Sequence, residues 1–281
     1  MKNTIRVFLS IILFLSLVAC SDGNDDLNPS NSNGTTDSIR IASFNIQVFG
    51  QSKLSEDETM DFIVKIIKNF DAVAIQEIRS KEQTVIPTLE DMLGDDEWDF
   101  KISERLGRTI SKEQYALIYR NDVITVDSVF QAKDPDDKLH REPYVVYCHS
   151  GNFDFSLINI HTDPDEVEQE VNYLDDILKQ ELAKEKDAIL LGDLNAAPDE
   201  FGEILMIPNV DWTIEEGMFT NVRETETYDN LIFVSSNLSE YIRGSVFNYK
   251  TEYGLTEDEA LEISDHYPVF GVFRNDMQDD D

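Results

Sequence analysis

The sequence predicts a layered α/β fold with mixed β-sheets. Short β-branched runs alternate with helical patterns in the first third of the chain, and several strand-like runs then follow one another without a long helical pattern. Alternation is typical of strands covered by helices, whereas consecutive strands favour antiparallel hairpins. The 281 residues, 41% of them hydrophobic, suffice for one large core, and neither a repeat nor a second linker indicates a second domain.

The first part of the chain supplies the alternating elements. Strands are expected over residues 39–47 and 72–75, where β-branched residues are concentrated. Helices are expected over residues 56–69 and 82–93, each of which follows one of these strands. The layered α/β prediction depends on this order.

The middle and last parts of the chain supply most of the remaining strands. Further strands are expected over residues 114–119, 123–130, 144–148, 153–160, 188–191, 230–234 and 267–273. A helix is expected to begin at Asp163, because Asp163 can serve as N-cap, Pro164 fits the first helical position and Glu166 closes a capping box. Apolar residues then recur at helical spacing, so one face of this helix is expected to be buried.

The first 19 residues have the features of an export signal. A short basic region with Lys2 and Arg6 precedes the apolar run 7–18, which is too short to span a membrane. The tetrapeptide Leu17-Val18-Ala19-Cys20 resembles the lipobox of bacterial lipoproteins, which implies cleavage before Cys20 and lipidation of this residue. The alternative is an ordinary signal peptide in which Cys20 is incidental.

The expected domain organisation follows from this start. Residues 1–19 are expected to be the signal peptide, 20–38 a flexible tether, 39–275 the globular domain and 276–281 an acidic tail. The protein is expected to be exported and lipid-anchored to the bacterial outer membrane, with cell-surface exposure and release left open, and to be a monomer. If Cys20 is lipidated, only Cys148 remains, so no intrachain disulfide is expected.

The charge of the chain limits its partners. Lys and Arg number 23 against 57 Asp and Glu, which gives a net charge of −34 and argues against binding of nucleic acid or anionic membranes through bulk charge. An anionic substrate then requires local cations or a bound metal. Residues 101–120 contain a candidate basic patch or, alternatively, a solvated face: Lys101, Arg105, Arg108, Lys112 and Arg120.

Polar residues stand where the predicted strands begin or end. Any one of them is more typical of a turn or a helix cap, but together they indicate a site on a rigid scaffold. In Gly192-Asp193-Leu194-Asn195, a buried strand delivers a carboxylate and an amide to the same side. The set consists of Asn45, Glu77, His161, Asp193, Asn195, Asp229, Asp265 and His266.

These residue types indicate metal-dependent hydrolysis of a phosphate ester. The oxygen donors of Asn45, Glu77 and Asp265 suit Mg²⁺ or Mn²⁺ better than Zn²⁺. Such a cation stabilises charge on a phosphoryl group, and a histidine backed by a carboxylate can deprotonate water. Asp265 and His266 are adjacent and point to opposite sides, so a more distant aspartate is the better partner for His266.

The ordered motifs resemble the endonuclease/exonuclease/phosphatase superfamily, with the closest resemblance to type I deoxyribonucleases. The resemblance is carried by Phe44-Asn45-Ile46, Ile75-Gln76-Glu77-Ile78-Arg79, Ile160-His161, Gly192-Asp193-Leu194-Asn195, Tyr228-Asp229, Ser264-Asp265-His266-Tyr267-Pro268 and the stretches SERLGRTISKEQYALIYR and REPYVVY. It implies a four-layer sandwich of two packed mixed sheets flanked by helices, with the site at one rim and DNA as substrate.

The resemblance also implies a role for each site residue. His161 would be an acid-base residue oriented by Glu113, and His266 would be oriented by Asp229. Glu77 would hold the divalent metal with Asn45, Asp193 and Asp265 close to it, and Asn195 would contact the scissile phosphate. Arg79 and Arg141 match arginines that approach DNA, and Arg108 of the Gly-Arg pair is a further expected substrate contact.

The sequence departs from the family pattern at three places. Asn195 is followed by Ala196-Ala197-Pro198 without the usual cysteine. The stretch FTNVRETETYD has charged residues where the family has a calcium-supported loop, so Ca²⁺ is a less favoured cofactor than Mg²⁺ or Mn²⁺. Ser111 stands where the family has an aromatic residue that enters the minor groove, so a changed grip on DNA is expected.

Three functions are compatible with these observations. The favoured one is an exported, envelope-tethered DNA endonuclease with little sequence preference. The second is a phosphodiesterase acting on a phospholipid such as sphingomyelin, or on a small phosphodiester. No long aromatic hairpin typical of membrane-docking lipases is evident in the sequence, and Arg79 with Leu106-Gly107-Arg108 favours nucleic acid. The third is a non-catalytic surface binding lipoprotein.

Overall fold

The computed structural model describes residues 37–277. The predicted signal peptide, Cys20, most of the predicted tether and the last four residues of the acidic tail lie outside the described residues. Among the helices within 37–277, none is long and apolar enough to cross a membrane. Cys148, the cysteine within this range, is a buried free thiol, and burial raises its pKa.

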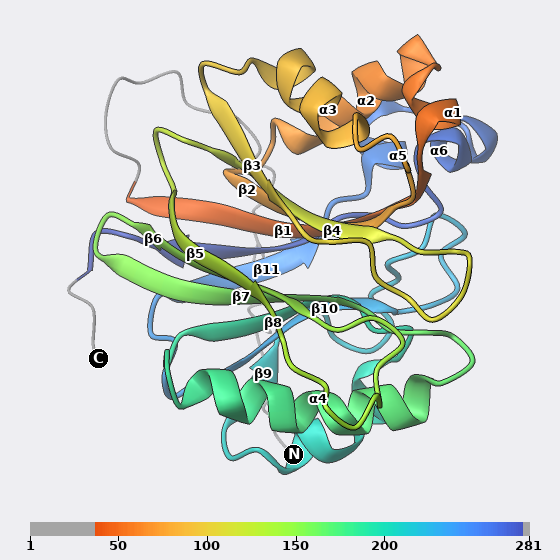
Figure 1. The fold of residues 1–281 in the computed structure, drawn as a ribbon. Coiled ribbons are helices and arrows are strands. Elements are labelled where there is room, and N and C mark those ends of the chain that lie inside the picture. Colours follow the sequence, from red (N-terminus) through yellow and green to blue (C-terminus); the bar gives the residue numbers. More distant parts are fainter. Residues whose placement is uncertain (1–36, 278–281) are drawn as a thin grey trace, which may run out of the picture. The chain divides into compact units, whose positions relative to one another are not determined.

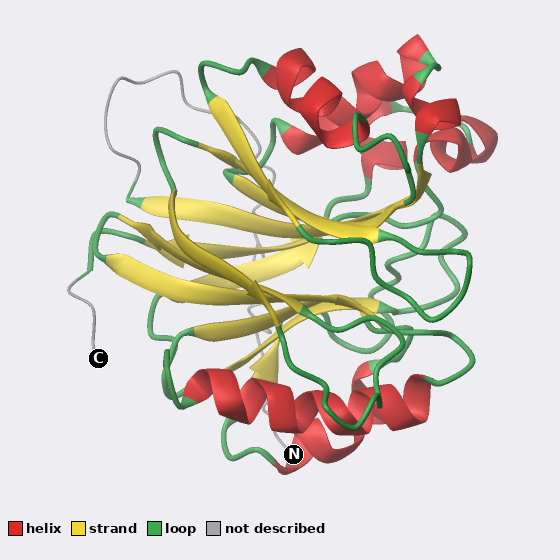
Figure 2. Ribbon diagram, viewed as in Figure 1, coloured by secondary structure: helices red, strands yellow, loops and turns green. Residues whose placement is uncertain are grey.

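Two six-stranded sheets pack against each other, and helices cover their outer faces (Figures 1 and 2). The first sheet has the order β11 (Tyr241–Val246), β12 (Val269–Arg274), β1 (Ser38–Phe49), β2 (Ala72–Ile78), β4 (Gln114–Arg120) and β3 (Trp98–Ile102). The second has the order β5 (Thr125–Gln131), β6 (Tyr144–Ser150), β7 (Phe153–His161), β8 (Ala188–Asp193), β10 (Asp229–Val234) and β9 (Val210–Trp212). The predicted four-layer α/β sandwich is confirmed.

The helices are divided between the two sheets. The first sheet carries α1 (Gln51–Leu54), α2 (Asp57–Ile67), α3 (Val85–Leu93), α5 (Tyr249–Tyr253) and α6 (Glu257–Ile263), and the second carries α4 (Val167–Leu182) with the 3₁₀ turns Pro198–Glu200 and Gly202–Met206 (Figure 1). Strand β1 shows how both faces of a sheet become buried. Ile39 and Ile41 face the other sheet, whereas Phe44 and Ile46 face the helices, because successive side chains alternate.

Mixed strand pairing brings the predicted polar residues to one rim. Strand β7 runs parallel to β8, and β10 runs antiparallel to β8. In these registers His161 lies opposite Asp193 on one side, and Asp229 lies opposite Asp193 on the other. Asp193 is therefore the shared neighbour of residues that are far apart in the sequence.

The predicted start of α4 is wrong. The helix begins at Val167 rather than at Asp163, and residues 163–166 form a turn. Asp163 Oδ1 accepts a hydrogen bond from the N–H of Asp165, while the N–H of Asp163 donates to Glu170 Oε2. An aspartate that bonds its own backbone two residues ahead makes an Asx-turn, which here replaces the helix cap.

Several elements were not expected from the sequence. Strands β3, β9 and β11 and helices α5 and α6 are short, and their apolar patterns are correspondingly weak. Helix α6 nevertheless carries a signal, because Thr256 and Glu259 form a complete capping box at its start. That box could have located α6, which leads directly into the segment that carries Asp265 and His266.

Candidate active site

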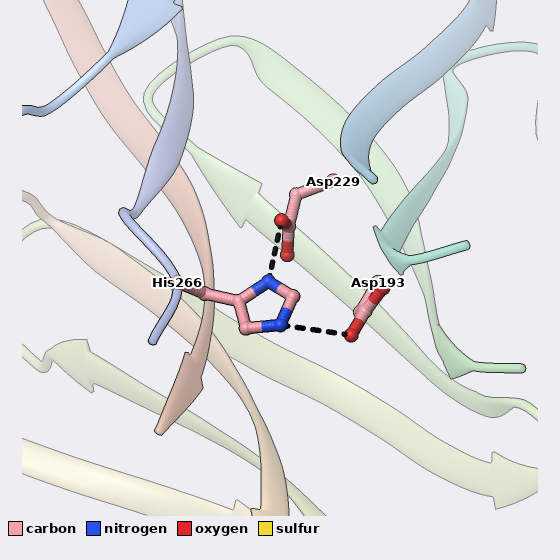
Figure 3. A group of neighbouring side chains, drawn as sticks. All are labelled: Asp193, Asp229 and His266. Carbon is pink, nitrogen blue, oxygen red and sulfur yellow. Dashed lines mark hydrogen bonds and ion pairs between the residues drawn. The ribbon is translucent and has the colours of Figure 1, made fainter. Parts of the chain in front are cut away.

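The candidate active site lies at the rim where strands of both sheets end. One histidine is held by a buried aspartate: His266 Nδ1 lies 2.8 Å from Asp229 Oδ2 (Figure 3). His266 Nε2 points toward Asp193 Oδ2 at 3.5 Å. The adjacent Asp265 is more distant, with Oδ1 3.9 Å from His266 Nε2. The structure thus pairs His266 with Asp229, the distant aspartate named on sequence grounds.

A second histidine has the same kind of partner. His161 Nδ1 lies 2.8 Å from Glu113 Oε1, and His161 Nε2 lies 3.6 Å from Asp193 Oδ2. One carboxylate oxygen of Asp193 therefore lies between the two imidazole rings. A carboxylate on Nδ1 fixes the tautomer and stabilises the charged ring, which prepares both histidines for proton transfer at Nε2.

The charges around the rings change their pKa values. Burial disfavours a charged His266, but the Asp229 and Asp193 carboxylates outweigh it and raise the pKa of His266 to about 10. Burial likewise opposes charge on His161, yet the hydrogen bond and charge of Glu113 raise the pKa of His161. Burial also opposes ionisation of Asp193, but the two histidines lower its pKa. Each ring therefore has a buried carboxylate that stabilises its charged form.

A group of oxygen atoms beside this pair fits a divalent cation. The Asn45 side-chain N–H donates to Asp193 Oδ2 at 2.9 Å and to Glu77 Oε1 at 3.4 Å. Among residues 37–277, the buried Asn45 Oδ1 has no hydrogen-bond partner. An unpartnered amide oxygen beside two carboxylates matches the hard donors that Mg²⁺ and Mn²⁺ prefer.

Asp265 is a further carboxylate at this rim. Its side chain is half-buried, and Gln47 Nε2 donates to Asp265 Oδ2 at 2.8 Å. A different set of donors, from Asp193, Asp229 and His266, also places its atoms within 4.8 Å of one another. Asp229 already binds His266, whereas Asn45 Oδ1 is without a hydrogen-bond partner among the described residues, so the set of Asn45, Glu77 and Asp265 suits a cation better.

The backbone at the rim is strained. Glu77, Val48 and Asn195 have φ angles of 61°, 49° and 48°, a region that side chains other than glycine rarely adopt. The strand pairing shifts register beside two of them, between Asn45 and Phe49 in β1 and between Ile75 and Ile78 in β2. Such bulges redirect side chains next to active sites. The N–H of Val48 then reaches Glu77 Oε2 at 2.8 Å.

Asn195 follows strand β8, which lies close to β7 at this end. Its N–H donates to Asp193 Oδ1 at 3.0 Å, and its side-chain Nδ2 donates to Thr162 O at 3.1 Å. Gly192, three positions earlier, has φ 150°, and a Cβ there would lie 1.8 Å from Ile160 O. Only glycine lets β8 approach β7 closely enough to place Asp193 beside His161.

The arginines predicted to approach DNA differ in their surroundings. Arg79 is partly exposed and links two site carboxylates, with Nη2 2.9 Å from Glu77 Oε2 and Nε 3.6 Å from Glu113 Oε2. Arg141 is 6% exposed, and its Nε lies 2.7 Å from Glu113 Oε1. Arg141 also donates to the carbonyls of His161 and Thr162. The enclosed guanidinium therefore holds Glu113 in place, and the expected approach of Arg141 to DNA stays a prediction.

The predicted basic patch is dispersed. Lys101 pairs with Asp99, and Arg120 lies at the end of β4 opposite the site. Arg105 donates to backbone carbonyls. Arg108 lies in the loop between Leu106 and Glu113, whose backbones bond to each other, and it pairs with Asp137 and Glu166. Lys101 on β3 and Arg120 on β4 thus lie outside the loop that contains Arg105, Arg108 and Lys112.

Some supporting residues were not identified from the sequence. Ser264 Oγ donates to Asn45 O at 2.6 Å and accepts the N–H groups of Gln47 and His266. The Lys53 ammonium donates to Gln47 O and Ile263 O, both at 2.7 Å, and burial lowers its pKa to about 8. Ser264 could have been found, because it belongs to the Ser264-Asp265-His266 motif. Lys53 belongs to no motif, so no signal in the sequence indicated it.

The fold and the site together define a metal-dependent phosphoester hydrolase. Two packed mixed sheets support two carboxylate-backed histidines on either side of Asp193, with a cluster of hard oxygen donors beside them. Residues 42–266 match the Endonuclease/Exonuclease/phosphatase family, and the chain belongs to this family. It is therefore an enzyme of a class that hydrolyses phosphodiesters with the help of divalent metal ions.

Known relatives carry the similarity over most of the chain. Deoxyribonuclease gamma of Mus musculus is 31% identical over 257 residues, which cover 82% of this chain and 83% of that protein. Deoxyribonuclease-1 of Homo sapiens is 33% identical over 259 residues, covering 83% and 91%. A solved endonuclease/exonuclease/phosphatase structure from Bacteroides vulgatus has a TM-score of 0.62 at 16% identity, covers 85% of this chain and 99% of that one, and supports the fold alone.

Proposed function

We propose that the protein is a divalent-metal-dependent DNA endonuclease with little sequence preference. The observation that carries the proposal is the pair of histidines whose Nε2 atoms lie 3.5 Å and 3.6 Å from the same Asp193 oxygen. Two proton-transfer groups on opposite sides of one carboxylate suit a reaction in which water adds to phosphorus while an alcohol departs. The relatives named deoxyribonucleases support DNA as the substrate.

The residues have complementary tasks in this reaction. One imidazole takes a proton from water as the new P–O bond forms, and the other gives a proton to the oxygen of the P–O bond that breaks. Glu113 and Asp229 hold the rings and balance their charge, and the Asn195 amide would contact the phosphate. A bound Mg²⁺ or Mn²⁺ would add Lewis-acid stabilisation of the phosphoryl charge, with Asn45, Glu77 and Asp265 as its holders.

The exposed arginines favour a polyanionic substrate. Arg79 and Arg108 each keep about a third of the side chain accessible although both are paired with carboxylates. They are local cations of the kind that a chain of net charge −34 needs to hold a phosphate backbone. We propose that Arg79 and Arg108 contact DNA and that Ca²⁺ is not required.

Plasmid nicking tests this function. Protein that begins at Ser21 should convert supercoiled plasmid to the open circular form with Mg²⁺ or Mn²⁺, and EDTA or His161→Ala should abolish the conversion. The same panel should include RNA and sphingomyelin. Folded, metal-loaded protein that leaves plasmid intact contradicts the proposal, and release of the choline head group would assign the phospholipid substrate instead.

We further propose that the enzyme is exported and anchored to the outer membrane through lipidated Cys20. The support is the basic, apolar and Leu17-Val18-Ala19-Cys20 sequence of the first 20 residues. Labelling of cells with a radioactive fatty acid should mark the wild type and not Cys20→Ala. Equal labelling of both would contradict the anchor.

A further inference from the structure

The loop 218–228 holds both members of the His266–Asp229 pair. Thr220 Oγ1 accepts the N–H groups of Tyr228 at 2.9 Å and Asp229 at 3.2 Å. The carbonyl of the same Thr220 accepts the N–H of Tyr267 at 2.6 Å. One residue of the loop thus fixes the backbone of Asp229 and the backbone next to His266.

The loop also pairs with the segment that precedes β12. The N–H of Val222 donates to Asp265 O at 2.8 Å, and Asn221 forms a β-bridge with His266. The distance between the Asp229 carboxylate and the His266 ring therefore depends on how this loop lies against residues 265–267. Residues 223–226 at the tip of the loop are exposed, and the Asn221 side chain binds the N–H groups of Thr225 and Glu226 there.

A lysine from another element supports the tip. Lys250, on the short helix α5, places Nζ 2.8 Å from Glu224 Oε1 and donates to Val222 O at 3.1 Å. Glu224 has a φ of 56°, so its backbone turns sharply to present the carboxylate. The Lys250 side chain is 20% exposed, more enclosed than the paired Lys184 at 53%. The ammonium is thus held between a carboxylate and a backbone carbonyl of the loop.

Charge gives this contact more weight than an ordinary surface pair. The loop contributes Glu224 and Glu226, is followed by Asp229 and binds Asp265 O through the N–H of Val222, in a chain with a net charge of −34. A surface pair that is fully solvated contributes little. The partly enclosed Lys250 ammonium binds both a carboxylate and a carbonyl oxygen of the loop, as a bound metal ion would, and it is covalently part of the chain.

We propose that Lys250 is a positioning residue that acts as the built-in cation of the 218–228 loop and thereby sets the His266–Asp229 contact. The kinetic part of this inference rests on the proposed nuclease function. Lys250 contacts neither histidine. It interacts with the loop and with the Tyr267 side chain next to His266, so its effect should reach catalysis through these contacts. Loop geometry should accordingly be independent of added Ca²⁺.

Kinetics of three variants test the positioning role. Lys250→Met should lower kcat for plasmid nicking about tenfold with little change in KM, because His266 is misplaced while the exposed arginines are intact. Lys250→Arg should keep kcat within about twofold, since a guanidinium can bind the same two oxygens. Lys184→Met is the matched control, because Lys184 forms a comparable pair with Glu181 at 2.7 Å and should leave kcat unchanged.

A measurement without turnover separates this inference from the proposed function. In metal-free protein, the NMR signal of the proton between His266 Nδ1 and Asp229 should appear far downfield in the wild type, Lys250→Arg and Lys184→Met, and should be lost or shifted in Lys250→Met. Loss of the signal in Lys250→Met supports the role of Lys250 even if plasmid is not cleaved. An unchanged signal together with unchanged kcat in folded Lys250→Met overturns it, and Glu224→Gln should reproduce the effect of Lys250→Met.

Discussion

The two histidine–carboxylate pairs have the same length but different supports. Both Nδ1–O distances are 2.8 Å. Glu113 is also bound by Arg141 at 2.7 Å and approached by Arg79 at 3.6 Å, so fixed charges surround the carboxylate. Asp229 is supported by the Thr220 hydroxyl through its backbone. Glu113 Oε2 and Asp229 Oδ1 both have no hydrogen-bond partner among the described residues.

The different supports of Glu113 and Asp229 show that one active site can position its two imidazole rings in two ways. The His161 side depends on buried ionic contacts, which resist movement but leave uncompensated charge if one partner is removed. The His266 side depends on a loop that pairs with the segment before β12, so its geometry depends on backbone contacts farther away. Four measurements can break or sharpen the comparison.

The largest effect is expected from removing either imidazole. His161→Asn and His266→Asn should each lower kcat about 1,000-fold, because each removes a positioned proton-transfer group. The assay is plasmid nicking with saturating Mg²⁺. His149→Asn is the matched control, since His149 Nδ1 lies 2.9 Å from Asp127 Oδ2 on an exposed part of β6. A variant of His161 or His266 that keeps wild-type kcat would remove that residue from the mechanism.

The next effect concerns stability. Glu113→Gln should lower the free energy of unfolding by about 3 kcal/mol, because the enclosed Arg141 loses its counter-charge. Asp229→Asn should have a smaller effect, since His266 can lose its proton and become neutral whereas arginine cannot. Urea unfolding at pH 7 in EDTA measures both. Equal losses would show that the two pairs do not differ in the way proposed.

The pH dependence of stability gives a third test. The pKa of His266 is raised from 6.5 to about 10, so protonation of this ring stabilises the fold fully below about pH 6.5. The contribution should be lost as pH rises through about 10. In EDTA, the difference in unfolding free energy between the wild type and His266→Gln should therefore shrink between pH 6 and pH 10. A difference that stays constant over this window contradicts the raised pKa.

The smallest effect is expected at Arg108. Arg108→Gln should raise KM for plasmid a few-fold with kcat unchanged, because the side chain lies outside both histidine pairs. The slope of log kcat/KM against log salt should decrease by about one if Arg108 contacts a phosphate. Asp137→Asn should change KM in the opposite direction by freeing the guanidinium. An unchanged salt slope in Arg108→Gln would exclude the phosphate contact.

The sequence located most of the site because its residues stand at the ends of recognisable strands. The strands predicted over 188–191 and 153–160 are present, and in the structure they extend to Asp193 and His161. Strand position does not reveal side-chain environment, however. The sequence did not indicate that Arg141 is buried and bound to Glu113 and to the carbonyls of His161 and Thr162. The predicted start of α4 was wrong for a similar reason, since Asp163 Oδ1 binds the N–H of Asp165 in a turn and does not cap the helix.

By itself, the sequence determined the class of fold, the kinds of catalytic group and the need for a local cation. Strand periodicity, the order of polar residues and the net charge of −34 contain that information. The family resemblance of its motifs had also implied which carboxylate supports which histidine. Only the tertiary structure decided that Arg141 holds Glu113 and that Lys250 on α5 binds the loop before Asp229. These contacts join residues far apart in the chain, and their geometry depends on sheet packing, bulges and loop conformation rather than on local pattern.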